Sequence, residues 1–273
     1  LGAMVFGNTD IERIQLNDDS MWPGDDENWN EPSGNRDDIE TIRALLFDGK
    51  NDEADKMFVD KFSRKTVVRS HQTLGDLFIN LNHKNITEYR RELNLNKALS
   101  TVSYKSNGNL ITEKIFVSNP DKAIIVEITS EAKEGLNGTI TLSRPKDNEV
   151  PTVKVTSEGN NLLVMRGEVT QREGEFNSES FPILNGVKFE TCLKIDNLGG
   201  KINRNADNLE LVNVKKATFY IVSNSSYYFE NYSQQNKIDL AAIDSKSFES
   251  LQTNHIKDHQ NLFNKVSIDL GDK

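Results

Sequence analysis

The stretch Val187-Lys-Phe-Glu-Thr-Cys-Leu-Lys-Ile195 decides the fold class. Every second residue in it is apolar or β-branched, and charged residues occupy most positions between them. A period of two is typical of a strand that buries one face and exposes the other. We therefore predict a half-buried antiparallel strand here, with Lys188, Glu190 and Lys194 on the solvated face.

Other stretches extend this pattern along the chain. Residues 122–128 and 217–222 are more continuously apolar, which predicts central strands, and residues 1–7 and 13–16 read as a hairpin. Turn signals such as Asn119-Pro120 and Gly199-Gly200 separate the runs about every ten residues. Many short strands at that spacing indicate a large antiparallel β-sandwich (a supersandwich), and the lack of a fixed-period repeat argues against a propeller or solenoid.

Helical periodicity appears at two places. Two short amphipathic helices are predicted within about residues 37–63, near the N-terminus, and a third helix follows from the spacing of Phe248, Leu251, His255, His259 and Leu262. Residues 265–270 look strand-like. We expect a β-sandwich domain over residues 1–236, with the helical insertion, and a helical linker over residues 237–273.

Composition excludes several classes of protein. The chain has 273 residues, with 42 acidic and 33 basic side chains and a formal net charge of −9, which argues against nucleic-acid binding. No apolar run approaches the roughly 20 residues of a membrane span. The single cysteine, Cys192, excludes an intramolecular disulfide and a cysteine-based zinc site. Neither a Gly-rich phosphate loop nor a Gly-x-Ser-x-Gly nucleophile elbow occurs, and we predict no cofactor and no metal.

Three groups of residues are candidates for chemistry. An acidic cluster flanks Trp22 and consists of Asp18, Asp19, Asp25, Asp26 and Glu27. Paired carboxylates beside an aromatic ring suit glycoside hydrolysis, but a solvated loop with a core-filling tryptophan explains them as well. His71 and Gln72 precede a strand, where a histidine binds substrate, acts as a base or is structural. His255 and His259 share a helix face, where packing on the sandwich is favoured over metal binding.

Several motifs resemble the N-terminal domain of glycoside hydrolase family 95, which comprises α-L-fucosidases and relatives acting on α-L-galactosides. The opening Leu1-Gly-Ala-Met-Val-Phe-Gly7 and Glu12-Arg-Ile-Gln-Leu-Asn17-Asp-Asp-Ser-Met-Trp22 is similar to that family's first signature, with Asp18 in place of glutamate. Gln72-Thr-Leu-Gly75-Asp76-Leu77 resembles Gln-Pro-Leu-Gly-Asp-Leu. The stretches Tyr89 to Ala98, Glu113 to Asp121 and His255 to Ile268 also follow the family pattern.

The resemblance implies a non-catalytic β-sandwich followed by a linker and an (α/α)6 barrel. In such enzymes the barrel inverts the anomeric carbon with a glutamate acid and an aspartate that activates water, and none of those residues maps onto this chain. We therefore expect the 273 residues to be the sandwich and linker of a longer bacterial enzyme. Its expected partners are its own downstream barrel and a fucosylated or galactosylated glycan, with no nucleic acid and no membrane. The enzyme class implies a periplasmic or secreted location.

Site residues follow from the same resemblance. The candidates for lining the barrel's pocket are Asn17, Asp18, Trp22, His71 and Gln72. An alternative is an autonomous carbohydrate-binding module that uses Trp22, Trp29 or the run Tyr227-Tyr228-Phe229. A third interpretation is the accessory domain of a related barrel enzyme, such as a glycoside phosphorylase of family 65.

Overall fold

The computed structural model describes residues 1–23, 32–63, 71–147, 149–172, 183–184, 186–269 and 271. The chain divides into two compact units. The first consists of Leu1–Met21, Gln72–Glu168 and Val187–Lys273, and the second of Trp22–His71 and Val169–Gly186. Four of the acidic-loop and aromatic residues singled out above lie outside the described residues, namely Asp25, Asp26, Glu27 and Trp29.

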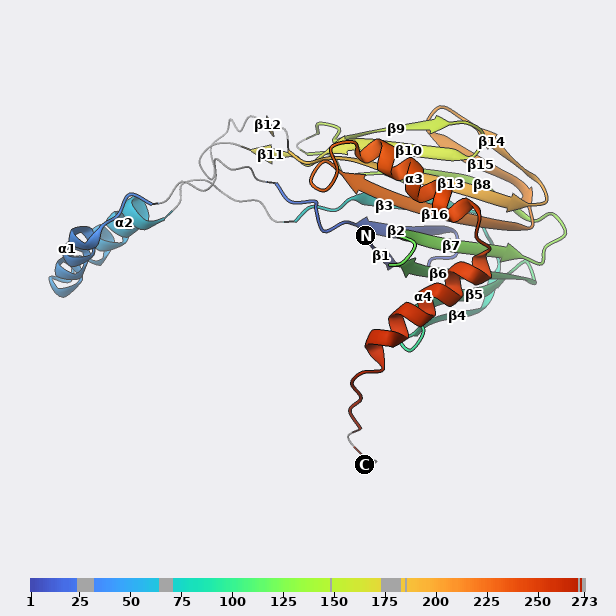
Figure 1. The fold of residues 1–273 in the computed structure, drawn as a ribbon, viewed down its shortest axis with the longest axis horizontal. Coiled ribbons are helices and arrows are strands. Elements are labelled where there is room, and N and C mark those ends of the chain that lie inside the picture. Colours follow the sequence, from blue (N-terminus) through green and yellow to red (C-terminus); the bar gives the residue numbers. More distant parts are fainter. Residues whose placement is uncertain are drawn as a thin grey trace. The chain divides into compact units, whose positions relative to one another are not determined.

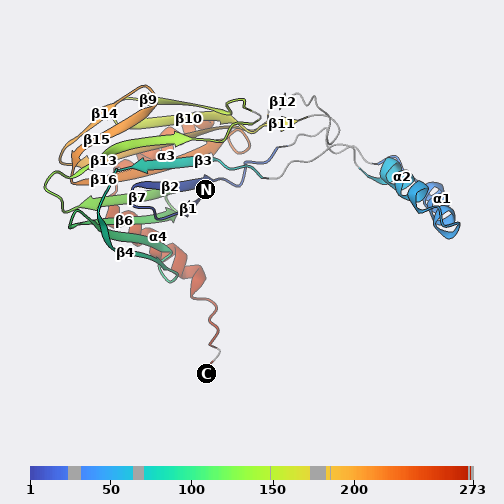
Figure 2. The same ribbon diagram turned by 180° about the vertical axis from the view of Figure 1, so that it is seen from behind.

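The first unit is a sandwich of two antiparallel sheets (Figures 1 and 2). The six-stranded sheet has the order β1-β2-β3-β8-β15-β14. Its strands are β1 (Gly2–Val5), β2 (Ile11–Asn17), β3 (Gly75–Asn80), β8 (Leu136–Ser143), β14 (Lys201–Arg204) and β15 (Asn208–Val214). The predicted N-terminal hairpin is confirmed, since Gly2 pairs with Asn17 and Val5 with Ile14 in antiparallel register.

The eight-stranded sheet has the order β4-β5-β6-β7-β16-β13-β10-β9. Its strands are β4 (Ile86–Asn94), β5 (Leu99–Ser106), β6 (Asn109–Ser118), β7 (Ala123–Ser130), β9 (Val153–Glu158), β10 (Leu162–Glu168), β13 (Lys188–Leu198) and β16 (Lys216–Ser225). The two most continuously apolar runs form β7 and β16, which pair with each other in the middle of the sheet. The predicted central strands and the predicted sandwich are therefore confirmed.

Two helices follow the last strand and cover the outer face of the eight-stranded sheet (Figure 1). They are α3 (Tyr232–Asp244) and α4 (Phe248–Phe263), capped by the side chains of Asn231 and Ser247. Ile243, Phe248 and Leu251 from the helices pack with Val164, Cys192, Val222 and other outward-facing residues of the strands. The middle strands of the eight-stranded sheet are thus buried on both faces, which explains why β7 and β16 read as continuous apolar runs.

The double burial corrects one prediction. Val187–Ile195 was expected to expose its charged face, yet Glu190 is only 2% exposed and Cys192 only 4% exposed. The face is covered because α3 packs directly on β13 and β16. A second expectation is also wrong: Val266–Asp269 form no strand, and Val266 and Ile268 are exposed.

The second unit contains two helices and a short pair of strands. The helices are α1 (Arg36–Phe47) and α2 (Asn51–Phe62), which pack on each other and confirm the predicted helices near the N-terminus. Asn35 caps α1 in a reciprocal arrangement with Asp38, and Gly49 adopts a φ of +74° just after the helix ends. The strands are β11 (Gln171–Arg172) and β12 (Ile183–Leu184).

Candidate functional site

The loop that follows β2 holds two of the predicted pocket residues. Asn17 is the last residue of β2 and is half-buried, and Asp18 is 9% exposed. One Asp18 carboxylate oxygen, Oδ1, accepts hydrogen bonds from the backbone N–H of Ser20 at 3.0 Å and from its hydroxyl at 2.5 Å. The hydroxyl of Ser20 also lies 2.7 Å from that of Ser225, at the end of β16. The loop is therefore fixed against the other sheet of the sandwich.

A second contact joins the same two segments. The phenol of Tyr228 donates to Asp19 Oδ2 at 3.0 Å, and this hydrogen bond raises the pKa of Tyr228. The neighbouring Tyr227 ring meets the Tyr228 ring edge-on, with centroids 4.8 Å apart and planes at 88°. Both rings are largely exposed, Tyr227 at 67% and Tyr228 at 55%. An acidic loop and an aromatic pair thus lie side by side although they are about 200 residues apart in sequence.

Gln72 is held beside this loop by a backbone contact. Its N–H donates to the carbonyl of Met21 at 2.9 Å, and its side-chain oxygen accepts from Arg144 Nη2 at 2.8 Å. The same guanidinium donates through Nε to the carbonyl of Thr73 at 2.9 Å. Arg144 therefore orients the segment that leads into β3, and the position of Gln72 depends on it.

Trp22 and His71 belong to the second unit and contact each other there. Their rings meet edge-on, with centroids 5.3 Å apart and planes at 65°. Trp22 is 53% exposed. It therefore does not fill the core, which was the alternative explanation for a tryptophan in a solvated acidic loop. Asn17, Asp18 and Gln72 therefore lie in the first unit, whereas Trp22 and His71 lie in the second unit and contact each other.

Sequence reasoning missed three participants around these candidates, namely Ser20, Arg144 and Ser225. Their partners are non-local, because Arg144 lies 72 residues from Gln72 and Ser225 lies 205 residues from Ser20. No motif in the sequence signals such pairs. The run Tyr227-Tyr228-Phe229 was noticed as aromatic, but its hydrogen bond to Asp19 was not predictable.

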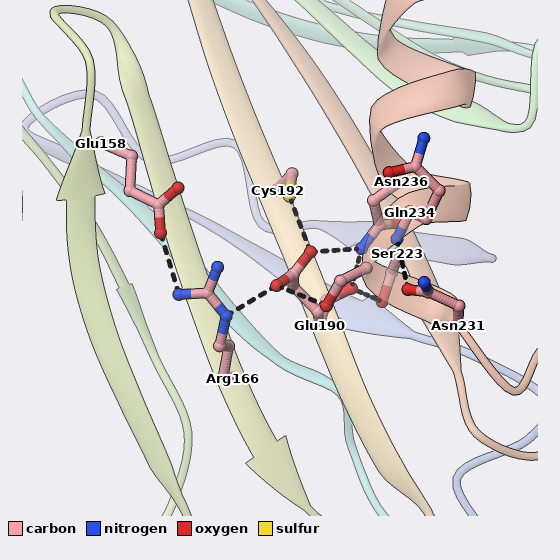
Figure 3. A network of polar contacts seen from close by, with 9 residues as sticks. Glu158, Arg166, Glu190, Cys192, Ser223, Asn231, Gln234 and Asn236 are labelled. Atoms are coloured by element: carbon pink, nitrogen blue, oxygen red, sulfur yellow. Dashed lines mark hydrogen bonds and ion pairs between the residues drawn. The ribbon is translucent and has the colours of Figure 1, made fainter.

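A larger polar network surrounds Glu190 under α3 (Figure 3). Its Oε2 accepts from Arg166 Nε at 2.6 Å and from the hydroxyl of Ser233 at 2.9 Å. Asn236, completely buried in α3, donates to the backbone carbonyl of Glu190 at 2.7 Å and to its Oε1 at 3.2 Å. Burial alone would raise the pKa of Glu190, but the hydrogen bonds from Asn236 and Ser233 and the Arg166 charge outweigh it and lower that pKa.

Other buried carboxylates also hold structural elements together. Asp76 receives two hydrogen bonds from Arg13 across β2 and β3. Asp121 accepts from Lys246, which lies between α3 and α4, at 2.6 Å. Each of these acids accepts a hydrogen bond from a basic side chain of the first unit. Such pairs stabilise the fold and do not indicate proton transfer.

Glu12 and Glu113 are two buried acids for which no hydrogen bond from a basic side chain is found among the described residues. Glu12 accepts from the backbone N–H groups of Phe6 and Gly7, and burial nevertheless raises its pKa to about 6. Glu113 is 1% exposed, and neither of its carboxylate oxygens has a hydrogen bond. Burial first, and the charge of Glu12 second, raise the pKa of Glu113 well above its ordinary value.

The histidine pair of α4 has a packing role, as expected. His255 stacks on Phe116 with centroids 4.9 Å apart, and its Nε2 lies 3.1 and 3.0 Å from the carbonyl oxygens of Lys97 and Ala98. His259 Nε2 lies 2.8 Å from the carbonyl of Leu95. Within the described ranges, no group of three or more histidine, cysteine, aspartate or glutamate side chains is arranged to hold a metal ion. None of the helices there is long and apolar enough to cross a membrane.

The first unit is a two-sheet sandwich with trailing helices, and comparison with known families identifies it as a glycoside hydrolase-type N-terminal domain. The chain belongs to the family described as glycosyl hydrolase family 65, N-terminal domain, whose model matches residues 1–229.

Two curated relatives align along almost the whole chain. Alpha-L-fucosidase 2 of Arabidopsis thaliana is 25% identical over 297 aligned residues, covering 99% of this chain and 34% of the relative. Probable alpha-fucosidase A of Aspergillus niger is 24% identical, covering 100% of this chain and 35% of the relative. The chain thus spans about a third of the length of these relatives. The solved structure of a putative kojibiose phosphorylase from human microbiome has 17% identity and a TM-score of 0.42, over 74% of this chain and 27% of that chain.

These findings confirm that the chain resembles a glycoside hydrolase N-terminal domain and is similar to α-fucosidases along its length. The matching family model carries the number 65, so membership of family 95 stays a prediction, as does a bacterial origin. The third interpretation, which named family 65, agrees with the family description.

Proposed function

We propose that this chain is the non-catalytic N-terminal domain of an inverting α-L-fucosidase-like glycoside hydrolase. In this proposal it packs on a downstream (α/α)6 catalytic barrel and helps to shape that barrel's pocket. The observation that carries the proposal is the alignment of almost the whole chain with about a third of the length of two proteins named as α-fucosidases. The proposed substrate is a fucosylated or galactosylated glycan, and the proposed location is periplasmic or secreted.

The non-catalytic role is supported by what the buried acids of the first unit do. Inverting hydrolysis needs one acid that donates a proton and a second carboxylate that activates water, across a gap of roughly 6.5–9.5 Å. Glu190 is instead occupied by Arg166 and residues of α3, and Asp121 by Lys246. These carboxylates are committed to holding the helices on the sheet.

Pocket shaping is assigned to Asn17, Asp18, Trp22, His71 and Gln72. Asp18 and Gln72 are both fixed by hydrogen bonds before any ligand arrives, which is the preorganisation a pocket wall requires. Trp22 offers an exposed ring whose edge-on contact with His71 restricts its orientation.

The test is steady-state kinetics of the longer polypeptide on nitrophenyl α-L-fucoside and nitrophenyl α-L-galactoside. We expect Trp22→Ala and Asp18→Asn each to change KM or kcat by about tenfold, because each removes a wall contact worth about 1.4 kcal/mol. Phe47→Ala, which removes an exposed aromatic ring on α1 that is 91% exposed, serves as the matched control and should leave both constants unchanged. Unaltered kinetics in both Trp22→Ala and Asp18→Asn would refute the pocket-shaping role.

An autonomous carbohydrate-binding module is the second candidate. The exposed rings of Tyr227 and Tyr228 favour it, because aromatic side chains pack well against the apolar face of a sugar. The two candidates differ in whether this chain changes catalysis. A module that merely tethers the enzyme leaves kcat on a small soluble fucoside unchanged when residues 1–236 are removed, whereas a pocket-forming domain is required for it.

A further inference from the structure

The pair Tyr227–Tyr228 and the carboxylate of Asp19 form one surface on the first unit. We propose that these three side chains are a platform that binds the terminal sugar of a neutral glycan. The inference deepens the proposed function and rests on it for the class of ligand. The platform goes beyond the pocket wall and the exposed rings, because it adds the carboxylate of Asp19, which holds Tyr228, as an acceptor for the sugar.

The platform is built before any ligand binds. Tyr228 is tethered to Asp19 at its phenol, and its backbone N–H donates to the carbonyl of Ser225 at 3.3 Å. The N–H of Phe229 donates to the same carbonyl at 3.1 Å, so the segment that carries both tyrosines forms a hydrogen-bonded turn. Little side-chain entropy remains to be lost at Tyr228 on binding, which favours affinity.

The loop on the other side is equally fixed. The hydroxyls of Ser20 and Ser225 lie 2.7 Å apart, and Asp18 accepts two hydrogen bonds from Ser20. Asp19 is therefore flanked by two anchored residues. Two segments from different sheets are joined at this surface, which presents the rings of Tyr227 and Tyr228 beside the carboxylate of Asp19.

The exposed rings themselves suggest the ligand. Two large aromatic side chains at 67% and 55% exposure leave apolar area in water, and a ligand that covers the rings gains the free energy of burying that area. A pyranose offers a C–H face that packs on an aromatic ring and hydroxyl groups that donate to a carboxylate. A 6-deoxy sugar adds a methyl group to the apolar face.

Charge selects a neutral ligand over an anionic one. Asp18 and Asp19 place two acidic side chains next to each other in the chain, so a carboxylated or sulfated sugar meets like charge. Tyr228 remains a neutral phenol at neutral pH, because the hydrogen bond to Asp19 raises its pKa above the ordinary value near 10. The surface therefore provides aromatic faces and acceptors without a compensating cation from these three residues.

The experiment is a ligand-observed NMR titration of the 273-residue chain with methyl α-L-fucopyranoside, methyl α-L-galactopyranoside and an anionic methyl glucuronide. We expect the two neutral glycosides to bind and the glucuronide to bind at least tenfold more weakly. The double variant Tyr227→Ala/Tyr228→Ala should weaken binding of the neutral glycosides by about tenfold or more. Tyr228→Phe keeps the ring but loses the tether, so its loss should be smaller than that of Tyr228→Ala.

Phe47→Ala is the control, because it removes an exposed ring from a helix of the second unit. Thermal melts of each variant establish that the fold is retained. Three results would overturn the platform: no binding of either neutral glycoside, undiminished binding by the double variant, or preference for the glucuronide. Each leaves the proposed function standing, since that function is judged on the kinetics of the longer polypeptide.

Discussion

Arg166 Nε lies 2.6 Å from Glu190 Oε2, and this ion pair joins strand β10 to the carboxylate that anchors helix α3. Arg166 continues through Nη1 to Glu158 on β9 at 2.9 Å, so one guanidinium connects the edge of the sheet to the buried acid (Figure 3). The two side chains differ in their exposure to solvent. The side chain of Arg166 is 48% exposed, whereas that of Glu190 is 3% exposed, so Glu190 depends on the pair more than Arg166 does.

Arg166→Met should therefore destabilise the chain although it removes a partly exposed side chain. Glu190 would keep its hydrogen bonds from Ser233 and Asn236 but lose its only basic partner of that network. We expect a loss of about 1–2 kcal/mol in the free energy of unfolding, less than for a fully buried pair because solvent screens Arg166. Arg90→Met, which breaks the exposed pair with Glu92, is the control and should cost less than about 0.5 kcal/mol in urea unfolding.

The same substitution carries a pH signature. The folded-state pKa of Glu190 is lowered, so its contribution to stability is present above the ordinary pKa and is lost as the pH falls through the folded-state value. The gap between the parent chain and Arg166→Met should therefore shrink at acid pH. A gap that stays constant from pH 7 to pH 3 would show that the ion pair is not its source.

Glu12 predicts a pH dependence of the opposite sign. Its pKa is raised to about 6, so the folded state takes up the proton more readily and the contribution to stability is fully present only below about pH 4.5. That contribution is lost as the pH rises from 4.5 to 6. Glu12→Gln should therefore gain relative stability between pH 4.5 and pH 7, by on the order of 2 kcal/mol, with thermal melts at both pH values as the measurement.

Asp10→Asn is the matched control for Glu12→Gln, because Asp10 is an exposed acid beside the same turn. It should show little change between the two pH values. If Glu12→Gln melts in parallel with the parent chain at both pH values, the raised pKa of Glu12 is contradicted.

His255 should hold α4 on the sheet. It combines the stack on Phe116 with a Nε2–H that faces the carbonyls of Lys97 and Ala98. We expect His255→Ala to weaken this docking by about 2 kcal/mol, which speeds hydrogen exchange of the α4 amides by about thirtyfold. His259→Ala, one turn later and less buried, should change exchange by less than threefold. Equal effects of the two substitutions would mean that His255 is not the anchor.

The strands were predictable because their signals are local. The period of two over Val187–Ile195 and the apolar run of β7 each record which faces of one strand are buried. Whether another element covers a strand face depends on residues far away in the sequence. Glu190 looked solvated because its neighbours in sequence are Phe189 and Thr191, and the sequence does not state that Asn236 and Ser233 lie above it.

The candidate site divides in the same way. The motif from Gln15 to Trp22 identified the loop after β2, and the structure places Asn17 and Asp18 at the start of that loop, with Gln72 beside it. The residues that fix this loop were not predictable, since Ser225 and Tyr228 arrive from the far end of the chain. A hydrogen bond between positions about 200 residues apart leaves no pattern in either stretch.

The central claim is that this chain shapes an active site without containing one. The most direct measurement is release of nitrophenol from nitrophenyl α-L-fucoside by the purified 273-residue chain, with the longer polypeptide assayed in parallel. The account predicts no release above background from the chain alone and turnover by the longer polypeptide. Turnover by the 273 residues themselves would contradict it.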